Sequence, residues 1–443
     1  MRPLRTLLVL LPLLLSGCTF PSGDALLAAP KTSANYQNLQ AELEELIAAG
    51  AAYTSPTKGE NRSSIQLRDL DNDGVEEAVS FFRGATTATS NNFAVYVYKK
   101  QDDRYVCTGS VESKGTEIVS VEYPAITPDG RRGMAITWRL TGDGTGALTL
   151  CDFDEDCAPR VLLETEYAAM ELTDMDSDGA KDLVLIATDP TGKRMARLYQ
   201  YHADKLTLTG EAATSPETTS VERMVGGRVQ LDRNAVFAEE KMASGIGLTT
   251  DIFVYEDGTL LNLALGGENS ISRSTYRPVS VYATDINNDG VIELPRAVLM
   301  AGYTDASAAD AVFMLDWYAY HVGSPPEVVM TTYKSISDGW SLAIDEAWHD
   351  TITATKGTDN GLSMVVFSEY QGGAQQIPLF TIYCAAGSAR DYYAGRADLI
   401  QLGQTTQAVY FARLAPGAGN GTLQITADDI RSRFSLAKQA WND

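Results

Sequence analysis

Three near-copies of one acidic nine-residue segment are the strongest constraint on the fold of this chain. They begin at Asp69, Asp174 and Asp285 and read DLDNDGVEE, DMDSDGAKD and DINNDGVIE. Each has oxygen-bearing side chains at positions 1, 3, 5 and 9 and a glycine at position 6. This spacing suits a hard cation, because a tight loop turns alternate side chains inward and position 7 can add a backbone carbonyl. Glycine suits position 6 because the turn needs a conformation that a β-carbon opposes.

The sequence therefore predicts calcium as a structural cofactor, with up to three ions. The predicted ligands are Asp69, Asp71, Asp73, Val75 and Glu77 in the first segment, Asp174, Asp176, Asp178, Ala180 and Asp182 in the second, and Asp285, Asn287, Asp289, Val291 and Glu293 in the third. The alternative for a single copy is a solvated acidic turn. Three copies that share the ninth-position carboxylate favour metal binding.

These segments differ from EF-hands. An EF-hand closes its site with a glutamate at position 12 and continues into a helix. Position 12 here is Ser80, Leu185 or Arg296, and short apolar runs follow the first two segments at 78–82 and 183–187. Short β-branched or aromatic runs after a turn predict strands rather than helices.

The intervals between the segments indicate the architecture. The segments start 105 and 111 residues apart, and each interval holds a second set of strand-like runs without an acidic segment. Halving the intervals gives a unit of roughly 53–55 residues, within the range of a four-stranded propeller blade. We therefore expect a mainly β fold, with a β-propeller-like domain over residues 61–335 that has about five blades, three of them with calcium loops.

The segments and the strands after them resemble FG-GAP and VCBS-type repeats, which occur in calcium-binding β-propellers of integrin-like form. The acidic positions, the glycine and the following apolar run carry this resemblance, over three stretches of about 15 residues. The resemblance implies a propeller with structural calcium. It implies no particular activity.

The N-terminus has the pattern of a secretion signal. Arg2 and Arg5 precede an apolar core over residues 7–15, which is too short to span a bilayer comfortably. The core ends in Leu-Ser-Gly-Cys, which resembles the lipobox of bacterial lipoproteins, and the layout is similar to uncharacterised lipoproteins of Gram-positive anaerobes. By that resemblance Cys18 is acylated and anchors the protein to the membrane on the extracellular face of the cell. The alternative is an ordinary secretory signal with an incidental cysteine.

The remaining parts complete the predicted organisation. Residues 1–17 are the signal peptide, 18–34 a tether, and 35–50 a helix that caps the next domain, because its apolar residues recur at helical spacing. The residue pattern of the sequence changes near residue 335. We expect a small α+β C-terminal domain over 336–443, with a terminal helix from Ala427 to Trp441.

Charge and cysteine content limit the partners. A net charge of −23 disfavours nucleic acid and anionic lipid. Cys151 and Cys157 bracket an acidic stretch, and the sequence leaves open either a local disulfide or two small buried thiols. The chain has no Cys/His spacing typical of zinc sites.

The sequence contains no recognisable set of catalytic residues. Its three histidines lie outside any metal-ligand spacing, and it has no nucleophile elbow, phosphate loop or dinucleotide fingerprint. We therefore expect a non-enzymatic cell-surface lipoprotein that binds an extracellular protein or glycan. Two alternatives stay open from the sequence: a polysaccharide hydrolase with its site at the propeller axis, because any two acidic residues could meet there, and a scaffold or sensor subunit of a membrane complex.

Overall fold

The computed structural model describes residues 34–84, 92–102, 104–113, 115–142, 145–189, 191–265, 275–303, 311–373, 375–416, 418 and 421–436. The predicted signal peptide, the lipidation site Cys18 and the tether up to residue 33 lie outside these residues. Within them, no helix has the length and apolar character needed to cross a membrane.

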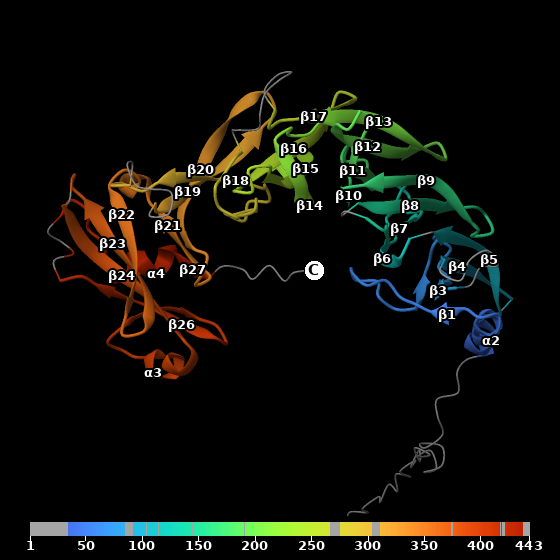
Figure 1. The fold of residues 1–443 in the computed structure, drawn as a ribbon, viewed down its shortest axis with the longest axis horizontal. Coiled ribbons are helices and arrows are strands. Elements are labelled where there is room, and N and C mark those ends of the chain that lie inside the picture. Colours follow the sequence, from blue (N-terminus) through green and yellow to red (C-terminus); the bar gives the residue numbers. More distant parts are fainter. Residues whose placement is uncertain are drawn as a thin grey trace, which may run out of the picture.

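The described residues are mainly β and form six antiparallel sheets. The sheets follow one another in chain order along an open arc (Figure 1), with the first sheet at the blue end and the sixth at the red end. Within most sheets, consecutive strands pair with each other as a meander.

The first three sheets use the first half of the chain. In the first sheet β1 and β2 both pair with β3, and β4 and β5 follow; the second and third sheets are four-stranded meanders. The first sheet contains β1 Ala52–Tyr53, β2 Ile65–Arg68, β3 Glu77–Arg83, β4 Phe93–Gln101 and β5 Arg104–Ser113. The second contains β6 Glu117–Glu122, β7 Met134–Arg139, β8 Gly146–Phe153 and β9 Pro159–Tyr167. The third contains β10 Ala169–Thr173, β11 Asp182–Thr188, β12 Arg194–His202 and β13 Lys205–Ala213.

The last three sheets are less regular. The fourth is a meander of β14 Thr218–Gln230, β15 Arg233–Met242, β16 Leu248–Glu256 and β17 Thr259–Asn262. The fifth contains β18 Leu294–Leu299, β19 Phe313–His321, β20 Ser324–Ser335, β21 Trp340–Ile344 and, from the end of the described chain, β27 Phe434–Leu436. The sixth contains β22 Ile352–Asp359, β23 Leu362–Tyr370, β24 Gln376–Ala386, β25 Ile400–Gln404 and β26 Ala408–Leu414, and β26 lies between β24 and β25.

The described residues contain few helices, and all of them are short except α2. They are α2 Ala34–Ala48, the 3-10 turns η1 Glu346–Trp348 and η2 Gly387–Ala389, α3 Arg390–Tyr393 and α4 Ala427–Arg433. Helix α2 corresponds to the helix expected over 35–50, and its Leu39 and Leu43 are buried against Ala78 and Phe82 of β3. It therefore covers the outer face of the first sheet.

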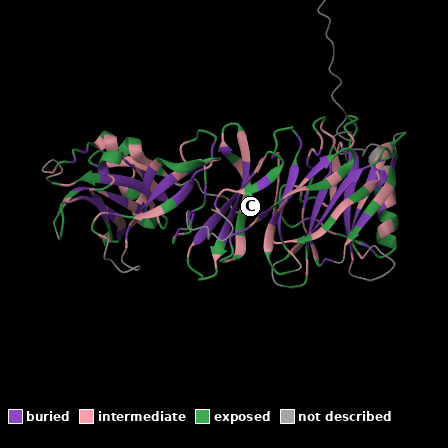
Figure 2. Cartoon of the chain, turned by 90° about the horizontal axis from the view of Figure 1, so that it is seen from above, coloured by how far each residue is buried: buried purple, intermediate pink, exposed green. Residues whose placement is uncertain are grey.

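Apolar layers between consecutive sheets hold the arc together, and Figure 2 shows buried residues running through every sheet. Strand β11 illustrates the pattern. Leu183 and Leu185 pack towards the second sheet, whereas Val184 and Ile186 pack towards the fourth. Because successive residues of a strand point to opposite faces, a strand buried on both faces has a continuous apolar sequence. This explains the uninterrupted runs that follow the acidic segments.

The C-terminal third differs from the sequence prediction. Five sheets begin before residue 335, and the sixth, β22 to β26, lies in the part that was expected to be a separate α+β domain. The boundary predicted after residue 335 falls between β20 and β21, which pair within the fifth sheet. One apolar cluster runs across it from Met300 to Ile430. Helix α4 ends at Arg433 instead of continuing towards Trp441, because Phe434 stacks on Trp340 and its strand pairs with β21. Residues 437–443 of the predicted helix lie outside the described residues.

Candidate functional site

The three acidic segments occupy related places in alternate sheets, the first, third and fifth. The first connects β2 to β3 and the second connects β10 to β11. The third leads into β18, and Thr284 and Glu293 pair across it as an isolated bridge. A spacing of about one hundred residues therefore corresponds to two sheets.

The three segments share one backbone path. The fourth residue of each has a left-handed conformation, with φ of 65° at Asn72, 64° at Ser177 and 61° at Asn288. The sixth-position glycines have φ of 85°, 94° and 91°. Left-handed backbone is uncommon for residues with a β-carbon and carries little cost for glycine. The glycine predicted from the sequence is thus required by the observed turn.

The carboxylates of each loop cap its own backbone in the same order. The first-position carboxylate accepts the N–H of position 6 at 3.1, 3.0 and 3.0 Å in the three loops. The third-position oxygen accepts the N–H of position 5 at 3.2, 3.2 and 3.1 Å. The fifth-position carboxylate accepts the N–H of position 7, which belongs to Val75, Ala180 or Val291, at 2.7, 2.7 and 2.8 Å. Each side chain is therefore held in place through at least one of its oxygens, and Asp285 uses both.

The ninth-position carboxylates, Glu77, Asp182 and Glu293, are buried beneath the loops. One oxygen of each accepts the N–H of position 2, at 2.9, 2.7 and 3.0 Å. The other oxygen of Glu77 and of Glu293, Oε1, has no hydrogen-bond partner, and the same is true of Oδ1 of Asp69 and Asp174. Leaving a buried carboxylate oxygen without a partner is costly. These oxygens are therefore suited to a cation.

The electrostatics of the ninth position agree with this interpretation. Burial raises the pKa of Glu77, Asp182 and Glu293 to about 7 in each case, and repulsion from the loop aspartates adds to the effect. A divalent cation would favour the ionised carboxylates and reverse this trend. In the first loop, oxygens of Asp69, Asp71 and Asp73 lie within 4.8 Å of one another, and in the second those of Asp174, Asp176 and Asp182 do so. The donor sets fit the hard cation that the sequence predicts.

The three loops differ in the hydrogen-bond partner of the third-position side chain. Asp71 Oδ2 accepts a hydrogen bond from Lys99 Nζ at 3.0 Å, whereas Asp176 Oδ2 accepts one from Gln200 Nε2 at 2.8 Å. In the third loop Asn287 donates its own amide to Asp289 at 2.8 Å.

The first two partners are structurally equivalent residues. The residue that directly follows each nine-residue loop pairs with a tyrosine on the next strand. These tyrosines are Tyr98, Tyr199 and Tyr318. The residue after that tyrosine is Lys99, Gln200 or Ala319. One position of the repeat thus supplies a cation, an amide or nothing to the loop.

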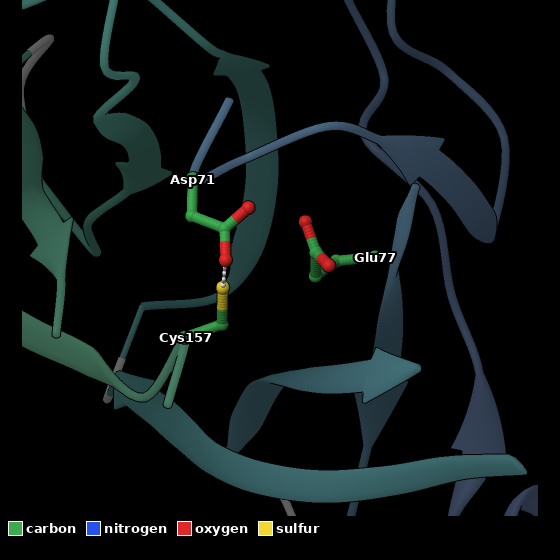
Figure 3. Close-up of side chains that lie close together, drawn as sticks. All are labelled: Asp71, Glu77 and Cys157. Carbon is green, nitrogen blue, oxygen red and sulfur yellow. Dashed lines mark hydrogen bonds between the residues drawn. The ribbon is translucent and has the colours of Figure 1, made fainter. Parts of the chain in front are cut away.

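A thiol from the second sheet also reaches the first loop. Cys157 lies in the turn between β8 and β9, is buried, and donates from Sγ to Asp71 Oδ2 at 3.1 Å (Figure 3). Burial and this hydrogen bond raise the pKa of the thiol, which keeps it protonated when no metal is bound. Cys151 is buried in the apolar layer between the first two sheets. Both cysteines are free, so of the two alternatives left by the sequence the structure has the buried thiols.

A second candidate site is a pocket of about 570 Å³. Most of its lining belongs to β6, β10 and β14, the first strands of the second, third and fourth sheets, which lie on the concave side of the arc (Figure 1). The lining includes Glu122, Glu171, Tyr167 and Arg223. The protein environment displaces water from both glutamates and raises their pKa values, to about 7 for Glu171. The repulsion between the two carboxylates contributes to the shift of Glu171.

Sequence reasoning missed Lys99, Cys157 and the pocket glutamates as functional candidates. Lys99 follows Tyr98 in an ordinary strand, and Glu122 is one polar residue in the alternation of β6. One sequence signal could have identified Lys99: it follows Tyr98 just as Gln200 follows Tyr199. This equivalence becomes visible only after the strands are aligned by their loops.

No protein-family model and no curated protein matches the chain. Several solved structures share 9–14% identity with it. The β-propeller domain of the Trilobed protease from Pyrococcus furiosus is 14% identical over 72% of this chain and 95% of its own, with a TM-score of 0.28. Saccharomyces cerevisiae Sqt1 is 10% identical over 81% and 100%, with a TM-score of 0.33. An exo-β-1,3-galactanase from Phanerochaete chrysosporium is 11% identical over 83% and 90%, with a TM-score of 0.24. Similarities of this size establish neither a shared fold nor a shared activity.

Proposed function

We propose that this protein is a calcium-stabilised lipoprotein of the bacterial cell surface that binds an extracellular protein or glycan and has no enzymatic activity. The single observation that carries the metal part is the ninth-position carboxylate. It is buried in all three loops, and in Glu77 and Glu293 one oxygen has no partner. A calcium ion at each loop would gather carboxylates that otherwise repel one another and would fix the loop to its sheet.

The six sheets are, in this proposal, blades of an open β-propeller of the FG-GAP and VCBS type. Two observations support the assignment: each sheet is antiparallel with four or five strands, and apolar layers join consecutive sheets face to face. Strand β27 would then fix the end of the chain to the fifth blade.

The lipid anchor completes the proposal. The lipobox-like Leu-Ser-Gly-Cys sequence, with acylation at Cys18, would hold the protein on the extracellular face of the membrane. The pocket on the concave side is the proposed ligand site, because it combines a volume of about 570 Å³ with Tyr167 and several charged side chains. Aromatic rings stack on sugars, and charged groups fix orientation.

A calcium-dependent melting experiment tests the metal part. The melting temperature is expected to fall in chelator, and Asp71→Ala combined with Asp176→Ala removes most of the difference between calcium and chelator. A control pair, Asp350→Ala with Asp391→Ala, removes two exposed aspartates outside the loops, whose side chains are 93% and 90% exposed, and keeps the difference. Equal melting curves in calcium and chelator for the unmodified protein would reject structural calcium.

One observation favours a second function, hydrolysis of polysaccharide at the pocket. Glu122 and Glu171 line the same pocket, and a carboxyl with a pKa of about 7 is suited to general acid catalysis. A screen against polysaccharides with Glu171→Gln separates the two functions. Loss of hydrolysis with retained binding supports the enzyme, whereas binding without any hydrolysis by the unmodified protein supports the non-enzymatic role. Glu166→Gln, an exposed glutamate outside the pocket lining, is the control.

A further inference from the structure

We propose that the first acidic loop and Cys157 together form a mixed oxygen and sulfur site for a thiophilic divalent cation of the zinc class. The second and third loops remain all-oxygen calcium sites. The inference builds on the proposal that the loops bind metal ions, and it assigns to one of them a different ion and a ligand from another sheet.

The first argument is the convergence of three donors. Ligand atoms of Asp71, Glu77 and Cys157 lie within 4.8 Å of one another, although they come from the loop, the start of β3 and the turn between β8 and β9 (Figure 3). Zinc binds sulfur at about 2.3 Å and oxygen at about 2.0–2.2 Å with tetrahedral geometry, so a sulfur and an oxygen on one ion lie roughly 3.6 Å apart. The three atoms would therefore have to approach one another by at most about 1.2 Å to bind one ion.

The second argument is an unsatisfied group at the same place. Glu77 is fully buried, with 0% of its surface exposed, and its Oε1 has no hydrogen-bond partner. Its other oxygen is already held by the N–H of Leu70 at 2.9 Å. The carboxylate of Glu77 faces the space shared with Asp71 and Cys157 (Figure 3). A cation in that space would supply the partner that Glu77 lacks.

The third argument is the choice of donor atoms. Carboxylate and carbonyl oxygens suit calcium, whereas thiolate selects zinc and softer metals. In the first loop a buried sulfur already lies 3.1 Å from Asp71 Oδ2. In the second loop Asp176 Oδ2 accepts the amide of Gln200, the counterpart of Lys99, and the cluster of candidate ligands consists of three aspartates. Within the described residues, sulfur thus joins the first loop alone.

Metal binding at this site is a ligand exchange without a redox step. The ion would form bonds to Cys157 Sγ and to carboxylate oxygens, and the thiol would lose its proton to solvent. Lys99 now donates to Asp71 Oδ2 and also to the carbonyl of Glu155 at 2.9 Å. It would keep its proton, release Asp71 and retain the carbonyl contact. The ion would then link the first sheet to the second through Cys157.

Cobalt is the probe for this site, because a cysteine thiolate bound to Co²⁺ gives a sulfur-to-metal charge-transfer absorption and bound zinc is spectroscopically silent. Reduced, metal-free protein is titrated with Co²⁺ in the presence of excess calcium. We expect one charge-transfer band that saturates at a single equivalent and that Zn²⁺ abolishes. Cys157→Ser removes the band and weakens Co²⁺ binding by at least about tenfold, a loss typical of perturbed metal sites.

Two control variants identify the source of the band. Cys107→Ser removes an exposed cysteine far from the loop in sequence and keeps the band. Asp182→Asn disrupts the second loop and also keeps it. A band that survives Cys157→Ser, or no thiolate band in the unmodified protein, overturns the inference.

Calcium-dependent melting of Cys157→Ser separates this inference from the proposed function. Retained calcium stabilisation shows that the variant is folded and that the other loops work, so loss of the band in that variant is assigned to the sulfur ligand. If the unmodified protein gives the band but no calcium stabilisation, the mixed site stands and structural calcium fails.

Discussion

The first and second acidic loops have the same backbone and the same internal hydrogen bonds, yet different neighbours. Both cap their own amides with the carboxylates at positions 1, 3, 5 and 9. The first is approached by the ammonium of Lys99 and the thiol of Cys157, and the second by the neutral amide of Gln200. Nine residues therefore determine the shape of the loop, and side chains from other strands determine its charge and donor atoms.

The third loop extends the comparison. It has Asn287 where the others have aspartate, and Ala319 where they have Lys99 and Gln200. It therefore carries one carboxylate fewer, and alanine stands at the position from which Lys99 reaches the first loop. Because calcium affinity depends on ligand charge, we expect the second loop to bind calcium most tightly. The following predictions test that order in zinc-free solution.

The largest effect is expected from removing the ninth-position charge of the second loop. With a Kd on the order of 10⁻⁴ to 10⁻³ M, 10 mM calcium at one site stabilises the folded state by about 1.4 to 2.7 kcal/mol. Asp182→Asn is expected to remove that contribution from the free energy of unfolding, measured in urea with and without calcium. Glu77→Gln in the first loop is expected to remove less, because Lys99 already opposes calcium there. An equal or larger loss in Glu77→Gln would contradict the proposed order.

Exchanging the neighbours should exchange the affinities. Lys99→Gln gives the first loop the partner of the second, and Gln200→Lys does the reverse. One charge at hydrogen-bond distance in a partly exposed site changes the binding free energy by on the order of 1 to 2 kcal/mol, or about tenfold in affinity. Calorimetric titration should show tighter calcium binding for Lys99→Gln and weaker binding for Gln200→Lys. Lys100→Gln, on the opposite face of β4, makes the same charge change and should leave calcium affinity unaltered.

The smallest effect is expected in the third loop. Asn287→Asp adds a fourth carboxylate and removes the amide that now donates to Asp289. Calcium affinity there should rise by about threefold, since affinity follows the number of charged ligands. The same titration measures it, with Asn288→Asp as a control at the non-ligand fourth position. No gain, or a gain of equal size in the control, would show that ligand charge does not limit this site.

Local patterns carried most of what could be predicted from the sequence. The loop glycines, the strands after the loops and the helix before the first sheet all follow from residues close together in the chain. The sixth sheet lies beyond the third and last acidic segment, so no interval between segments could count it. Strand β27 was missed because Phe434 and Leu436 have their partners in β21, about ninety residues earlier.

The candidate site was only half predictable for the same reason. Its ligands within each loop are local, but Cys157 is 86 residues from Asp71, and Lys99 is 28 residues away. Contacts between side chains so far apart in the sequence depend on how strands and sheets pack against one another. The pocket glutamates likewise meet through the packing of the first strands of neighbouring sheets. The spacing of residues along the chain therefore predicts neither the contacts to Asp71 nor the pair of pocket glutamates.

The most direct test of the central claim is anomalous diffraction from crystals of the protein grown with both calcium and zinc. Data collected on either side of the zinc edge distinguish the two ions. We predict a zinc peak at the first loop, bonded to Cys157 Sγ and Glu77, and calcium density at the second and third loops, with the ion contacting Asp182 and Glu293. Well-ordered loops without an ion would contradict metal binding, and zinc spread equally over the three loops would contradict the role of Cys157.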